Sequence, residues 1–127
     1  MLIAAAVGRD RLRRRALRVI ENPDRWFYYS PFVALEVLPK AVYHGNTDEA
    51  EFYRTYLREA TCFGDLDRIY EIASSEAERS GMAAMDALHA AAAHLAKCEQ
   101  LVTTENPRKP LFRTKLVEVV GLSRLKE

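Results

Sequence analysis

The stretch from Gly81 to Glu105, GMAAMDALHAAAAHLAKCEQLVTTE, constrains the fold of this chain more than any other. Its alanine-rich first part predicts a helix over Met82–Ala96, and its apolar end predicts a strand over Gln100–Thr104. The helix carries one early carboxylate, Asp86, and the strand leads directly into Glu105. An acid on a helix and an acid at a strand end can meet at the carboxyl edge of a parallel sheet, where α/β folds place their sites.

The rest of the chain alternates helical periodicity with short, continuously apolar runs. Ser30 and Pro31 predict the start of a helix, which Pro39 is expected to kink or end. Asp65 predicts the cap of a later helix, and Gly81 its stop. Further helices are expected over Arg11–Glu21, Asp48–Ala60 and Leu66–Arg79, strands over Arg25–Ser30 and Leu116–Val120, and a β-bridge within Thr61–Gly64. This order predicts an α/β fold whose short parallel sheet is covered on both faces.

The length of 127 residues indicates a single domain, residues 1–127, with a substantial core. Charge is unevenly spread: residues 1–25 and 106–127 each carry a net charge of +4, and residues 26–105 carry −7. Four arginines, at positions 11, 14, 15 and 18, share one face of the first predicted helix. Three interpretations stay open for them: contacts to phosphates, a solvated helix face, or a docking surface for a partner.

Neither cysteine usage nor hydropathy indicates a secreted or membrane protein. Cys62 and Cys98 form no CxxC pair and have no histidine at zinc spacing. The apolar run Leu2–Val7 is too short to span a bilayer and has no charged segment before it. We therefore expect a cytoplasmic protein without a membrane partner.

Three acids on three different elements are the candidates for chemistry. Glu36 lies within VALEVL, where its apolar neighbours favour an inward orientation that requires a cation, although an outward orientation is the alternative. If Glu36, Asp86 and Glu105 converge, their repulsion requires a divalent cation or raised pKa values. Oxygen ligands suit Mg²⁺ or Mn²⁺, and such a site hydrolyses phosphodiesters. His89, three residues after Asp86, either touches this site or is structural.

At MDALHAAAAHLAKCEQLVTTE the sequence resembles the PIN domain family, in particular the compact bacterial kind to which VapC-type toxins belong. SPFVALEVLPKAV is similar to the second acidic helix of that family, ENPDRWFYYS to the strand before it, and KPLFRTKLVEVVGL to the closing strand. The resemblance covers nearly the whole chain. It implies a three-layer α/β/α sandwich of the Rossmann-like kind, with a short parallel sheet.

The resemblance also implies a metal-dependent endoribonuclease with four acids, Mg²⁺ or Mn²⁺ as cofactor and RNA as substrate. Glu36 matches the second acid, Asp86 the third and Glu105 the fourth. Thr103 matches a hydroxyl residue that helps to orient the site, and Ser30 matches a small polar residue at the end of the second strand. If the chain is a toxin, a small antitoxin protein is its expected partner.

Two departures from the family pattern bear on activity. The fourth acid is usually aspartate, and the longer Glu105 is expected to hold metal more loosely or through a water molecule. The chain opens at Met1-Leu2-Ile3, where the first central strand and its Asp-x-Asn motif should already have passed. Either the chain begins at an internal methionine or it is a degenerate member.

With that strand missing or reduced, strand edges and apolar helix faces lose their cover. We expect either that Met1–Ala6 fills the gap as a short strand or that two chains cover each other as a homodimer. Nuclease activity is predicted to be weak or absent. The alternative function is a catalytically degenerate PIN-like module that binds RNA or a partner protein. A nucleotide-binding domain is disfavoured, because the chain has no GxGxxG and no Walker lysine loop.

Overall fold

The computed structural model describes residues 1–125, which form a mixed α/β fold that is mostly helical. The helices are α1 Leu2–Val7, α2 Asp10–Glu21, α3 Pro31–Tyr43, α4 Thr47–Glu59, α5 Leu66–Ser80 and α6 Ala84–Leu95. The strands are β1 Tyr28–Tyr29, β2 Thr61–Cys62, β3 Gln100–Thr103 and β4 Glu118–Gly121, with short 3₁₀ helices η1 Pro110–Arg113 and η2 Leu122–Arg124. In this part of the chain, no helix combines the length and apolar character needed to cross a membrane.

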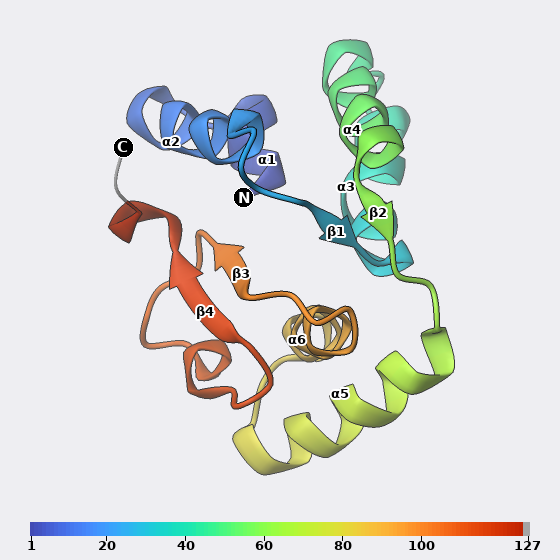
Figure 1. The fold of residues 1–127 in the computed structure, drawn as a ribbon. Coiled ribbons are helices and arrows are strands. Elements are labelled where there is room, and N and C mark those ends of the chain that lie inside the picture. Colours follow the sequence, from blue (N-terminus) through green and yellow to red (C-terminus); the bar gives the residue numbers. More distant parts are fainter. Residues whose placement is uncertain (126–127) are drawn as a thin grey trace.

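The strands form two separate parallel pairs. β1 pairs with β2, and β3 pairs with β4 in a register that sets Gln100 opposite Glu118 and Thr103 opposite Gly121. In Figure 1 the first pair lies beside α3 and α4, and the second lies below α2. The expected α/β class and the parallel pairing are confirmed. The four strands do not join into one sheet within residues 1–125.

The amino-terminal segment is helical, so the prediction that Met1–Ala6 forms a makeshift strand is wrong. Alanine favours helix, and the amides of Ala5 and Gly8 donate to the carbonyls of Met1 and Ala4 at 3.0 and 2.9 Å. Leu2, Ala4 and Ala5 are buried. Gly8 ends α1 in a position where a Cβ would collide with the carbonyl of Ala4. A short apolar run is compatible with either a strand or a helix, and here local hydrogen bonds decide for the helix.

Helix α3 begins as predicted and ends later than predicted. The Ser30 hydroxyl accepts a hydrogen bond from the Phe32 amide at 3.2 Å, which confirms the N-cap. The helix continues past Pro39 to Tyr43, so Pro39 does not end it. Val37 and Ala41 are buried in a cluster with residues of α1 and α4, and this packing offsets the hydrogen bond that proline cannot make.

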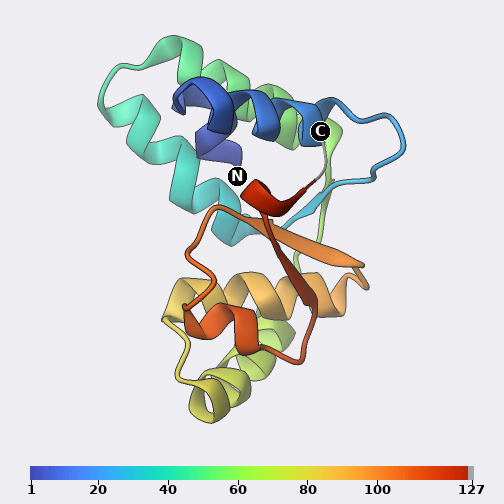
Figure 2. The ribbon, with the colours of Figure 1, turned by 90° about the vertical axis from the view of Figure 1, so that its left-hand side faces the viewer.

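Helix α6 packs against α5 through its alanines. Ala87, Ala90 and Ala91 are buried in one cluster with Ile69 and Ala73 of α5. Small side chains allow the two helices to approach closely, and Gly81 makes the turn between them in the left-handed conformation (φ 77°). In Figure 2, α1 to α4 form an upper group, while α5, α6 and the pair β3–β4 form a lower one. Arg25 donates to the Gln100 side chain at 3.2 Å across these groups.

A buried carboxylate joins α5 to the segment before β4. Glu76, 6% exposed, accepts hydrogen bonds from Arg79 at 2.7 and 2.9 Å, from the Thr114 hydroxyl at 2.6 Å and from the Lys115 amide at 3.1 Å. These bonds outweigh burial and lower the pKa of Glu76 to about 2. Glu76 therefore holds the closing segment against α5, a role the sequence analysis did not assign to it.

Candidate functional site

One large groove, about 1150 Å³ in volume, contains the candidate residues. Its walls come from α1, the segment around β1, the first turns of α3, one face of α6 and the length of β3. Among the lining residues are all three predicted acids and the two hydroxyl residues: Glu36, Asp86, Glu105, Ser30 and Thr103. The structure thus brings every candidate to one concavity, from segments far apart in sequence.

Glu105 is positioned by the end of β3. The buried Thr103 accepts a hydrogen bond from the Glu105 amide at 3.1 Å through its hydroxyl. This bond fixes the backbone turn that carries Glu105 away from the strand. The Glu105 side chain is 3.9 Å from the Lys109 ammonium, and because both are exposed the pair contributes little stability.

The Glu36 side chain is partly exposed and has a hydrogen-bond partner. It is 43% exposed and lies 3.1 Å from Nε2 of His89, which is 19% exposed. His89 therefore touches the site, and an imidazole occupies the position where the sequence required a cation. The other ring nitrogen, Nδ1, is buried with no partner in the described residues. The tautomer with its proton on Nε2 avoids a buried unpaired N–H and donates to Glu36.

Asp86 lies among the other charges of the groove. Burial raises the pKa of Asp86 most, followed by the negative charge of Glu105, and Glu36 adds a smaller effect of the same sign. His89 and Lys109 oppose these effects. Glu105 and Glu36 are therefore close enough to Asp86 to influence its pKa.

Two further positive groups border this acidic region. Burial lowers the pKa of the Met1 ammonium, while the charges of Glu36 and Glu105 oppose that effect. Met1 also lines the groove. Neither Met1 nor Lys109 was a sequence candidate, because nothing in the local pattern links them to the acids.

The carboxylates have the donor chemistry of a Mg²⁺ or Mn²⁺ site but not its arrangement. Across residues 1–125, no three His, Cys, Asp or Glu side chains gather closely enough to hold a metal ion. Glu36 instead pairs with His89, and Glu105 with Lys109. As they are placed, these residues do not fit the metal that the family resemblance implies.

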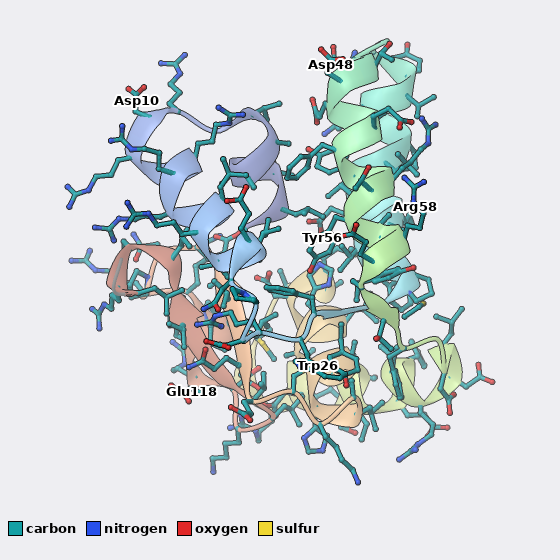
Figure 3. All side chains as sticks on the ribbon, turned by 45° about the horizontal axis from the view of Figure 1, so that its top comes forward. Asp10, Trp26, Asp48, Tyr56, Arg58 and Glu118 are labelled. Carbon is teal, nitrogen blue, oxygen red and sulfur yellow. The ribbon has the colours of Figure 1, made fainter. Side chains whose placement is uncertain are left out.

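The arginines of α2 divide into two groups. Arg15 donates to the carbonyl of Ser123 in η2, so this part of the stripe faces the end of the chain. Arg11 and Arg14 are exposed. Figure 3 shows the long side chains of α2 projecting into solvent near Asp10. The stripe is thus partly a packing surface and partly a solvated one.

Comparison with family profiles, with curated proteins and with solved structures finds no match to this chain.

Proposed function

We propose that this chain is a PIN-like domain of the ribonuclease type, built on the plan of a three-layer α/β/α sandwich, with RNA as its substrate. The observation that carries the proposal is the meeting of Glu36, Asp86 and Glu105 in one groove, where burial and, after it, the charges of Glu105 and Glu36 raise the pKa of Asp86. Parallel pairing of β3 with β4 and of β1 with β2 supports the fold assignment.

Within the groove, the residues have different roles. Asp86 is the proton acceptor in this proposal, because its raised pKa makes it a stronger base than an ordinary aspartate. Thr103 fixes the backbone of Glu105, and His89 orients Glu36. Outside the groove, the exposed Arg11 and Arg14 of α2 supply positive charge for the phosphates of an RNA strand.

We expect cleavage by this chain to be weak. Glu36 and Glu105 are engaged by His89 and Lys109, and no three-residue metal cluster exists within residues 1–125. Mg²⁺ or Mn²⁺ remains the cofactor class that the resemblance implies. If the domain acts as a toxin, a small antitoxin that covers this groove is the partner to expect.

The test is cleavage of a fluorogenic RNA with Mg²⁺ or Mn²⁺, using Asp86→Asn and the exposed Asp67→Asn as its matched control. We expect slow cleavage that Asp86→Asn abolishes and Asp67→Asn leaves unchanged. Cleavage that survives Asp86→Asn at the level of the unaltered chain would come from a contaminant or another site, and would refute the assignment.

A second function, a catalytically degenerate PIN-like binding module, is favoured by the pairing of Glu36 with His89. Titration with Mn²⁺ in a calorimeter separates the two functions. A nuclease should bind Mn²⁺ measurably and lose that binding with Asp86→Asn. A binding module should bind Mn²⁺ only weakly and show no cleavage, while still retaining an RNA or a protein partner.

A further inference from the structure

Two strand edges that line the groove have no strand beside them. Within residues 1–125, β1 pairs only with β2, and β3 pairs only with β4. Both β1 and β3, with the residues next to them, line the groove over Phe27–Ser30 and Gln100–Glu105. A strand edge presents N–H and C=O groups that proteins normally pair or cover. The groove is therefore bordered by two half-sheets, each able to accept one more strand.

The same groove exposes an unusual number of large apolar side chains. Trp26, labelled in Figure 3, is 84% exposed on the loop before β1. Single exposed apolar residues are normal, whereas several around one concavity indicate an interaction surface. The exposed large apolar residues that line it are Ile3, Val7, Leu12, Trp26 and Tyr28.

The groove is large enough to hold an extended segment. One strand residue in a packed sheet occupies about 4.8 Å by 3.3 Å by 10 Å, or roughly 160 Å³. A groove of about 1150 Å³ therefore has room for about seven such residues. Ala92 and Ala93 of α6, and Ala96 directly after it, line the groove with small side chains that leave space for β-branched side chains above them.

We propose that this groove binds an extended, apolar peptide segment from another protein, which inserts as a strand between β1 and β3 and hydrogen-bonds to both. Successive N–H groups of a strand point to opposite edges, so a single segment can pair with two neighbours. A second copy of this chain has no strand with both edges free among its described residues, because each strand is already paired on one side. The proposal does not depend on nuclease activity.

The probe is the acetylated and amidated peptide KVIVIVK, used with two N-methylated forms. One form is methylated on the valine nitrogens and the other on the isoleucine nitrogens, so each blocks pairing at one edge only. Trp26 is the single tryptophan of the chain and reports binding through a blue shift of its emission. Anisotropy of a labelled peptide gives the affinity independently.

We expect the unmodified peptide to bind and both methylated forms to bind at least about tenfold more weakly. Weakening by only one form would indicate addition to a single edge and would overturn insertion. Equal binding by all three would indicate non-specific apolar adhesion, and no binding would refute the groove as a peptide site. If sedimentation shows a dimer and the peptide does not bind, a second copy covers the groove and the proposal fails.

Discussion

Replacement of Glu76 by glutamine tests whether one buried carboxylate holds the closing segment to α5. The pKa of Glu76 falls from 4.5 to about 2 in the folded chain, and each pKa unit corresponds to about 1.4 kcal/mol, or about 3 kcal/mol in all. Arg79, the first cause of that lowering, is 44% exposed. Solvent screening of this pair reduces the expected loss in Glu76→Gln to about 2 kcal/mol near neutral pH.

The pH dependence gives the sharper result. A carboxylate with a lowered folded pKa stabilises the fold above its unfolded value of 4.5, and this contribution disappears as the pH falls toward about 2. Urea titrations followed by far-UV circular dichroism should therefore show the unaltered chain and Glu76→Gln differing near neutrality and converging in acid. Glu78→Gln, at an exposed position of the same helix, is the control. Equal destabilisation by both variants, or a difference that persists in acid, would refute the role of Glu76.

Three other substitutions test separate parts of the fold by urea titration. Asp86→Asn should raise the free energy of unfolding near neutral pH, because burial and then the charge of Glu105 raise the pKa of Asp86. This gain in stability should vanish below the ordinary aspartate pKa of 3.8. A loss of stability near neutral pH would contradict the prediction. Ala91→Leu should destabilise by about 1–3 kcal/mol through overpacking, whereas the exposed Ala84→Leu should have little effect. Ser30→Ala should cost about 1 kcal/mol through loss of the α3 cap, and an unchanged stability would show that the cap is not needed.

The parts of the fold that sequence predicted are those that neighbouring residues decide. The alanines of α6, the left-handed Gly81 before them and the β3 strand after them all follow from local pattern and backbone preference. The N-cap at Ser30 is equally local. For the same reason Asp86 could be assigned to the start of a helix and Glu105 to the end of a strand before any contact was known.

The parts that sequence missed depend on residues far apart in the chain. In the sequence, Glu76 is one more acid on an amphipathic helix. Its role depends on hydrogen bonds from Thr114 and Lys115, which lie far from it in the chain. Leu2–Val7 has the composition of a strand or a helix, and the choice depends on whether a strand edge or a helix is available to receive it. His89 and Glu36 lie 53 positions apart, so their hydrogen bond could not be inferred from spacing.

The gap between β1 and β3 separates the two segments that lead to Glu36 and Glu105, and this arrangement gives a last prediction. Glu105 follows β3, and Glu36 lies on the helix that follows β1, so the separation of β1 and β3 affects that of the two acids. One strand inserted between β1 and β3 would set these two strands about 10 Å apart, which is twice the normal strand spacing. If strand insertion changes the separation of the two acids, the Mn²⁺ affinity should change with it, and Mn²⁺ should change the peptide affinity by the same factor.

Calorimetric titration of Mn²⁺ with and without the KVIVIVK peptide measures this coupling directly. The valine-methylated peptide is the control, because it keeps the apolar side chains and loses pairing at one edge. If the unmodified peptide binds and the Mn²⁺ affinity does not change, the positions of Glu36 and Glu105 are independent of the gap between β1 and β3. The pairings with His89 and Lys109 would then be what keeps the acids from a metal ion, and their removal, rather than completion of the sheet, would be the route to a metal site.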